Sequence, residues 1–143
     1  MIQIINGPNL NMLGVREPDI YGRETFESYL EKLKALFPGE EIKYFQSNSE
    51  GELIDCIQKA GMLPECRGIV LNPAAYTHYS IAIADAISSV KAPVVEVHIS
   101  NIHARESFRH ETVTGARAKA VLTGFGLKGY ELAVSYLLDG PTS

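Results

Sequence analysis

Residues 68–72 read Gly-Ile-Val-Leu-Asn (GIVLN), a short apolar run that ends in a polar amide. Similar runs occur at Ile2–Ile5, Ile42–Gln46 and Val94–His98, and a fifth is expected at Lys119–Gly124. Strands that are buried on both faces are continuously apolar, whereas strands with one wet face alternate apolar and polar residues. The five runs therefore predict the strands of a parallel sheet.

Segments with helical periodicity separate these runs. Apolar residues recur every three or four positions in each segment, which is typical of a helix with one buried stripe. Pro38-Gly39 ends the first helix, and Ser49 with Glu52 forms a capping-box pattern that opens the second. The expected stripes are Phe26, Leu30, Leu33 and Phe37; Leu53, Ile57 and Ala60; Ile83, Ile87 and Val90; and Tyr130, Val134 and Leu137 in a last helix over about Lys128–Leu138.

Strands that alternate with helices predict an α/β fold, a doubly wound sandwich with a five-stranded parallel sheet. The chain has 143 residues without an internal repeat, a low-complexity tract or a linker, so we expect a single domain over residues 1–143. In such a fold, ligands bind outside the carboxyl ends of the strands. Functional residues are therefore expected directly after the strands.

The composition narrows the classes of function. The net charge of −4 and the lack of a basic run argue against a nucleic-acid partner. Cys56 and Cys66 are ten residues apart, which fits neither a redox pair nor a zinc knuckle, so we expect two reduced, mostly buried thiols in a cytoplasmic protein. No apolar run approaches a membrane span or a signal peptide, and the four histidines lack metal-ligand spacing, so we expect no membrane association and no catalytic metal.

Polar residues gather after three of the strands, in NGPNLNMLGVREPDIYG (6–22), LNPAAYTH (71–78) and EVHISNIHARESFRH (96–110). Glu96 and His98 are two apart on one strand, so they share a face, and the carboxylate can orient the imidazole as a general acid or base. A structural histidine satisfied by a carboxylate remains the alternative. Ser100 and the amides that follow His98 could form a small anion-binding concavity.

Segment 71–78 and the later part of segment 96–110 also have a functional and a structural interpretation. Thr77 is a candidate N-cap, which would place His78 in the first turn of a helix. Arg105 and Arg109 are one helical turn apart and could face the same way toward an anionic or hydroxyl-rich ligand. The structural alternatives are a turn-forming Asn72, a surface histidine and a solvated basic face.

Together, these three segments and the closing GFGLKGYELAV (124–134) resemble the type II 3-dehydroquinate dehydratases over essentially the whole chain. The resemblance implies a flavodoxin-like fold and a lyase that converts 3-dehydroquinate to 3-dehydroshikimate by trans dehydration, a step of the shikimate pathway that precedes chorismate and the aromatic amino acids. It implies no cofactor, no metal and no Schiff base, and a homododecamer of four trimers. One departure is Glu111 and Thr112, where the family usually has a second histidine and a serine.

The resemblance also implies roles for individual residues. Tyr21 matches the base that removes the proton next to the ketone, Arg16 the cation beside it, and His98 the general acid, oriented by Glu96. Asn9 matches the residue that helps to hold a water against the enolate oxygen. The substrate-binding matches are Asn72, His78, Ile99, Ser100 and Arg109, with Asp85 reaching the site of a neighbouring subunit.

The tyrosine base needs help from its surroundings. A free phenol has a pKa of about 10, so its ionisation costs about 4 kcal/mol of barrier at neutral pH. A nearby guanidinium lowers such a pKa by roughly 1–3 units, and Arg16 lies in the same segment as Tyr21. Gly14 and Gly22 bracket this segment, which we interpret as a lid that excludes water.

Two other functions remain open. A non-catalytic flavodoxin-like module could hold a flavin or a small anion, although no phosphate-binding loop is recognisable. A different cofactor-free lyase or isomerase could use His98 as its base. The sequence also does not distinguish aromatic biosynthesis from quinate breakdown, because the chemistry is the same.

Overall fold

The computed structural model describes residues 1–15, 19 and 23–141. One all-parallel sheet has the strand order β2-β1-β3-β4-β5, which confirms the predicted fold class. The fifth strand is one residue shorter at each end than expected from the sequence. The strands are β1 (Ile2–Asn6), β2 (Ile42–Gln46), β3 (Gly68–Asn72), β4 (Val94–His98) and β5 (Ala120–Thr123).

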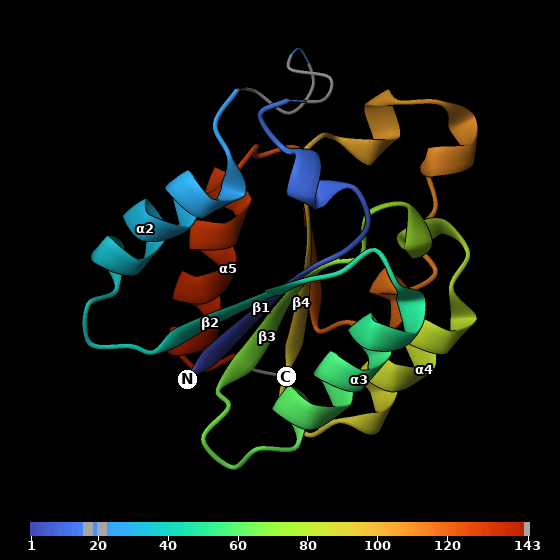
Figure 1. The fold of residues 1–143 in the computed structure, drawn as a ribbon. Coiled ribbons are helices and arrows are strands. Elements are labelled where there is room, and N and C mark those ends of the chain that lie inside the picture. Colours follow the sequence, from blue (N-terminus) through green and yellow to red (C-terminus); the bar gives the residue numbers. More distant parts are fainter. Residues whose placement is uncertain (16–18, 20–22, 142–143) are drawn as a thin grey trace.

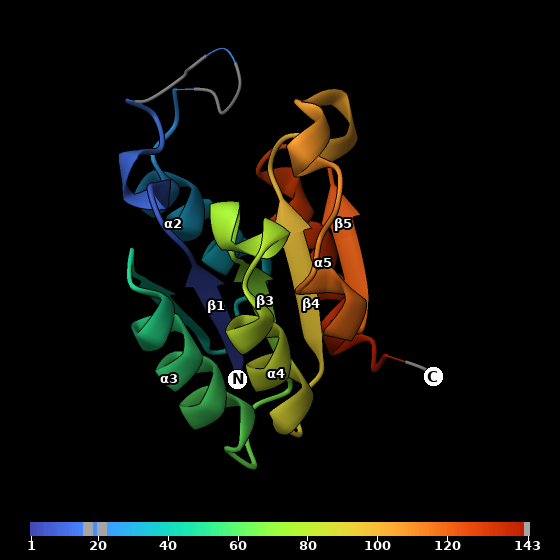
Figure 2. The ribbon, with the colours of Figure 1, turned by 90° about the vertical axis from the view of Figure 1, so that its right-hand side faces the viewer.

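Helices cover both faces of the sheet, as Figures 1 and 2 show. On one face lie α2 (Phe26–Leu36) and α5 (Lys128–Leu138), and on the other lie α3 (Glu50–Gly61) and α4 (Ile81–Ser89). All four predicted helices are confirmed. Within the described residues, five short 3-10 helices that the sequence did not predict follow the strands: η1 (Leu10–Met12), η2 (Ala74–His78), η3 (Ile102–Ala104), η4 (Ser107–Arg109) and η5 (Gly115–Arg117).

The sheet separates two hydrophobic cores. Under α2 and α5, Phe26 stacks on Tyr44 at 4.7 Å between ring centroids and meets the buried ring of Tyr130 edge-on at 4.9 Å. Under α3 and α4, the expected stripe residues Leu53, Ile57, Ile83 and Ile87 are buried. The central strands β1, β3 and β4 are buried along their whole length, because helices cover both of their faces.

From β1 the chain continues to β2 on one side of the sheet, whereas from β3 it continues to β4 and β5 on the other side. The carboxyl ends of β1 and β3 are therefore the topological switch point of the sheet. Asn6 and Asn72, the last residues of the two strands, are partners in the sheet register. Directly after them, the amide of Gly7 donates to the carbonyl of Asn72 over 2.7 Å. A Cβ at Gly7 would lie 2.6 Å from the carbonyl oxygen of Pro73, so only glycine allows this close approach.

Two helix starts differ in part from the prediction. Ser49 is the N-cap of α3, and its hydroxyl accepts from the amide of Glu52, but the Glu52 carboxylate accepts from Ser47 and does not close the capping box. Thr77 is not the N-cap of α4. Ser80 has that position, with its hydroxyl accepting from the amide of Ile83 over 3.0 Å, because a 3-10 helix intervenes and buries Thr77.

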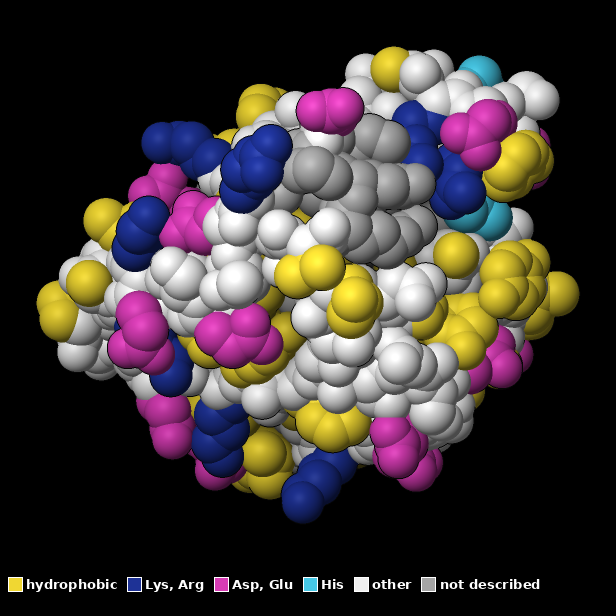
Figure 3. Space-filling model, turned by 45° about the horizontal axis from the view of Figure 1, so that its top comes forward, with side chains coloured by type: hydrophobic (Ala, Val, Ile, Leu, Met, Phe, Trp, Pro, Cys, Tyr) yellow, Lys and Arg dark blue, Asp and Glu magenta, His cyan; other side chains and the backbone are white. Residues whose placement is uncertain are grey.

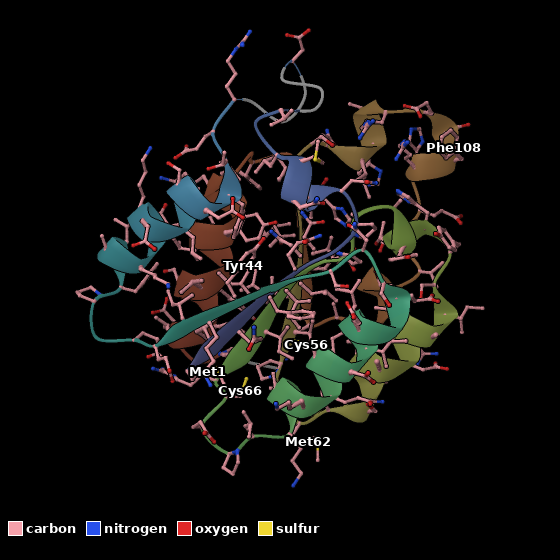
Figure 4. The ribbon with its side chains drawn as sticks, in the orientation of Figure 1. Met1, Tyr44, Cys56, Met62, Cys66 and Phe108 are labelled. Atoms are coloured by element: carbon pink, nitrogen blue, oxygen red, sulfur yellow. The ribbon has the colours of Figure 1, made fainter. Side chains whose placement is uncertain are left out.

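The two cysteines lie apart from each other, as Figure 4 shows, with Cys66 near Met1 and Cys56 on α3. Both are free thiols, and both are half-buried, so they are less buried than expected. Burial raises the pKa of the Cys56 thiol to about 11. Among the described residues, no helix has the length and apolar character needed to cross a bilayer, and no three His, Cys, Asp or Glu side chains group as metal ligands.

Candidate active site

A cleft of about 190 Å³ opens at the carboxyl ends of β1, β3 and β4. It brings together most of the described site residues expected from the sequence, as the rule for parallel sheets requires. The polar residues that line it are Asn9, Asn72, His78, His98, Ser100, Arg105 and Arg109, together with the buried Ile99 and several apolar side chains.

Arg16, Tyr21 and Asp85 are not among the described residues that line the cleft. Arg16 and Tyr21 lie outside the described residues, as does Gly22 at the end of the expected lid. Asp85 is exposed on α4 and does not line the cleft of its own subunit. Its expected role toward a neighbouring subunit therefore stays a prediction.

His98 and Glu96 form the buried pair that their spacing predicts. The Nε2 atom of His98 lies 2.7 Å from Oε2 of Glu96, and the two side chains are 6% and 0% exposed. Burial works against the charge of Glu96, but the hydrogen bond and charge of His98 and the hydroxyls of Thr114 and Thr112 outweigh it and hold the pKa of Glu96 below its ordinary value. Nδ1 is then the ring nitrogen of His98 that can serve the cleft.

Asn72 is held from behind by a buried hydrogen-bond network. Its Nδ2 donates to the hydroxyl of Tyr130 over 2.9 Å, and this hydroxyl donates to Oδ1 of Asn6 over 2.7 Å. The Oδ1 atom of Asn72 accepts from the amide of Ala74 over 3.0 Å. These bonds fix the orientation of the Asn72 amide at the floor of the cleft.

Two cleft residues have unusual backbone conformations. Asn9 has a φ of 71° and Ala74 a φ of 53°, and they are the two non-glycine residues with positive φ in the described part of the chain. The amide of Asn9 also donates to Oδ1 of Asn48 over 3.0 Å. Left-handed conformations of side-chain-bearing residues concentrate at functional sites, where the surrounding contacts maintain them.

The cationic side of the cleft comes from the segment after β4. Arg105 and Arg109 both line the cleft, but Arg105 follows η3 in an extended conformation and Arg109 ends η4, so they do not share one continuous helical turn. Arg109 also donates through Nε to Glu106 over 2.9 Å. Figure 3 shows dark blue Lys and Arg side chains grouped beside cyan histidine side chains on the face where the strands end.

His78 of η2 contacts the segment that follows β4, and Phe108 lies in η4 of that segment. The Nδ1 atom of His78 lies 2.7 Å from the carbonyl oxygen of Glu111, so η2 and the segment after η4 are joined at the cleft. Phe108 lies at the edge of this segment in Figure 4 and is 66% exposed.

The residues that hydrogen-bond to the catalytic and substrate-binding candidates from behind were not predicted from the sequence. Thr77, Thr112 and Thr114 all reach the Glu96 carboxylate, and Tyr130 reaches Asn6 and Asn72. The buried stripe of α5 indicated that Tyr130 is in the core, but no local pattern indicated where its hydroxyl points. Nothing in the spacing of the threonines indicated that they converge.

Comparisons with known proteins agree with the geometry. The family model described as "Dehydroquinase class II" matches residues 1–138. The chain is 54% identical to the 3-dehydroquinate dehydratase of Halalkalibacterium halodurans, over 97% of this chain and 96% of that protein. Two crystal structures of type II dehydroquinases superpose with a TM-score of 0.89. One is from Propionibacterium acnes (45% identity, 96% of this chain, 95% of that chain), and the other is from Butyrivibrio crossotus (47% identity, 96% of each).

Proposed function

Because the chain belongs to the type II dehydroquinase family, we propose that it dehydrates 3-dehydroquinate to 3-dehydroshikimate with His98 as the general acid and Tyr21 as the base. The reaction is a step of the shikimate pathway and uses no cofactor or metal. The observation that carries the proposal is the buried Glu96–His98 pair, which opens onto a cleft lined by Asn, Arg and His side chains.

The reaction removes a proton next to a ketone and expels a hydroxyl from the β carbon. When the base takes the proton, the electron pair of the broken C–H bond forms a carbon–carbon double bond, and the π pair of the ketone moves to its oxygen, which gives an enolate. When the enolate collapses, the bond to the hydroxyl breaks, and His98 supplies the proton with which the hydroxyl leaves as water. The anionic Glu96 supports this step, because it stabilises the protonated imidazole that must deliver the proton.

The base and its cation lie outside the described residues, and their assignment rests on the resemblance of residues 6–22 to the family motif. Tyr21 takes the proton, and Arg16 lowers the pKa of its phenol. Asn9, which lines the cleft directly after β1, helps to hold a water against the enolate oxygen. A donor at this position stabilises the charge that develops in the transition state.

The substrate is a small anion with several hydroxyl groups, and the cleft offers partners for both features. Ile99 and Ser100 hold the carboxylate through backbone amides and a hydroxyl, and His78 and Arg109 contact the ring hydroxyls. Asn72 positions the substrate at the floor of the cleft. The cleft volume of about 190 Å³ fits a ligand of this size class.

The assembly and the compartment are part of the same proposal. Following the family, the protein forms a cytoplasmic homododecamer of four trimers, in which Asp85 of one subunit reaches the site of the next. The exposure of Asp85 on α4 is consistent with such a contact.

The test is turnover by a matched pair of variants. Tyr21→Phe and His98→Asn should stay folded by circular dichroism and lose nearly all conversion of 3-dehydroquinate, whereas Tyr79→Phe, an exposed tyrosine outside the cleft, should keep wild-type activity. Near-normal turnover by Tyr21→Phe would overturn the assignment of the base. Borohydride with substrate should leave the enzyme active, because no Schiff base forms; inactivation would overturn the mechanism.

A further inference from the structure

Three threonine hydroxyls surround the carboxylate of Glu96. The hydroxyls of Thr77 and Thr112 lie 2.8 and 2.7 Å from Oε2, and the hydroxyl of Thr114 contacts Oε1. His98 Nε2 is the fourth polar neighbour, at 2.7 Å from Oε2. Since Glu96 is 0% exposed, these contacts replace the water that would otherwise solvate the carboxylate.

The hydroxyls come from two segments that are far apart in the sequence. Thr77 belongs to η2, and Thr112 and Thr114 lie between η4 and η5. The amide of Val113 donates to the carbonyl of Thr77 over 2.7 Å, and the amide of Gly115 donates to the Thr112 hydroxyl over 2.8 Å. These bonds join the two segments through their backbones and hold the Thr112 hydroxyl in place independently of Glu96.

The number of hydrogens in this cluster favours an ionised Glu96. A carboxylate has no hydrogen of its own and accepts up to about four hydrogen bonds, whereas each hydroxyl can donate one. The three hydroxyls and the Nε2–H of His98 provide up to four donors, and the hydroxyls also contact one another, Thr77 with Thr112 at 2.5 Å and with Thr114 at 2.8 Å. A protonated Glu96 would bring a further hydrogen into a buried cluster that already has donors for these positions.

We propose that Thr77, Thr112 and Thr114 are positioning residues for the acid step: they hold Glu96 as a carboxylate and thereby fix the His98 ring with Nε2–H toward Glu96 and Nδ1 toward the substrate. The inference rests on the proposed role of His98 as the general acid. It extends that role to residues that do not line the cleft themselves.

The same segments also carry substrate-binding candidates. His78 ends η2, one residue after Thr77, and its Nδ1 contacts the carbonyl of Glu111, one residue before Thr112. The three hydroxyls thus connect the side of the cleft at which His78 binds the substrate ring to the general acid His98. Among the described residues, His98 is the titratable group in contact with Glu96, and His78, Arg105 and Arg109 are the titratable groups that line the cleft around His98.

The experiment compares Thr112→Val and Thr114→Val with Thr112→Ser and Thr114→Ser. Valine keeps the shape and removes the hydroxyl, whereas serine keeps the hydroxyl and removes a methyl group. We expect each valine variant to lower kcat by about tenfold to a hundredfold with little change in KM, because a hydrogen bond to a charged group is lost. The serine variants should recover most of kcat.

The pH dependence separates positioning from general stability. Without one hydroxyl donor, Glu96 takes up a proton more readily, so the acidic limb of the kcat–pH profile should move to higher pH in the valine variants and return to its wild-type position in the serine variants.

Ile57→Val is the matched control, since it shortens a fully buried side chain of α3 that does not line the cleft. It should lower stability and leave the pH profile unchanged. Valine variants with a wild-type kcat and pH profile would overturn the proposal.

Nitrogen-15 NMR of the His98 ring provides a readout that does not need activity. In the wild-type protein the neutral ring should carry its proton on Nε2, and in the valine variants the pH at which the ring signals respond to Glu96 should rise. A wild-type ring with its proton on Nδ1 would overturn the inference even if turnover is normal. If the wild-type protein does not turn over 3-dehydroquinate, the proposed function fails, while the NMR result still decides whether the hydroxyls hold Glu96 and His98 in place.

Thr114 is fully buried and Thr112 is half-buried. Thr112→Val therefore keeps the test available if Thr114→Val does not fold.

Discussion

Removing the hydroxyl of Tyr130 is a direct test of the network that holds Asn72. In Tyr130→Phe the ring stays in the core, but two partners lose their hydrogen bonds: Nδ2 of Asn72, at 2.9 Å, and Oδ1 of Asn6, at 2.7 Å. Asn6 is 0% and Asn72 3% exposed, so water cannot replace the hydroxyl without a local rearrangement. Each buried group left without its partner costs about 1–3 kcal/mol, so the loss of both bonds should lower the free energy of unfolding by about 2–6 kcal/mol.

The assay is urea unfolding at neutral pH, followed by circular dichroism. Burial raises the pKa of Tyr130, so its hydroxyl stays neutral over the whole accessible pH range and the effect should not depend on pH. Tyr79→Phe is the control, because its side chain is 62% exposed and its loss should change the free energy of unfolding by less than about 0.5 kcal/mol. Equal stability of the two variants would refute the argument that the network holds Asn72.

Three further predictions concern the backbone, a helix cap and acid stability. Gly7→Ala should destabilise the protein by more than about 1 kcal/mol in urea unfolding and lower activity, since the new Cβ would lie 2.6 Å from the carbonyl oxygen of Pro73. Ser80→Ala should cost about 1 kcal/mol in the same measurement, because the amide of Ile83 loses its cap; no loss would show that the cap is not needed. The lowered pKa of Glu96 means that its contribution to stability is complete above the ordinary carboxyl pKa and is lost as the pH falls through the lowered value. Unfolding measured across acidic pH should show this loss in the wild-type protein and a weaker dependence in Glu96→Gln.

Local patterns were sufficient for most of the fold. The four helices and five strands follow from apolar runs and periodic stripes, because burial on a sheet or under a helix depends on residues close in sequence. The spacing of Glu96 and His98 was equally informative, since residues two apart on a strand share a face. His78 and Arg109 were expected at the cleft because ligands bind outside the carboxyl ends of parallel strands, and both residues line it.

Features that depend on distant partners were not predictable. Thr77 fits the pattern of an N-cap, but its hydroxyl turns inward to Glu96, and Ser80 caps the helix instead. The residues that complete the site meet only in the folded chain: Thr112 is 16 positions from Glu96, and Tyr130 is 124 positions from Asn6. Side-chain hydrogen bonds over such separations leave no periodic signal in the sequence.

The measurement that tests the central claim most directly is the conversion of 3-dehydroquinate by the purified, chelator-treated protein without any added cofactor. The product is a conjugated enone acid, so the account predicts new ultraviolet absorbance that grows with time in the wild-type protein and is nearly absent in His98→Asn. A wild-type protein that produces no absorbance, or a His98→Asn variant that produces it at the wild-type rate, would contradict the account.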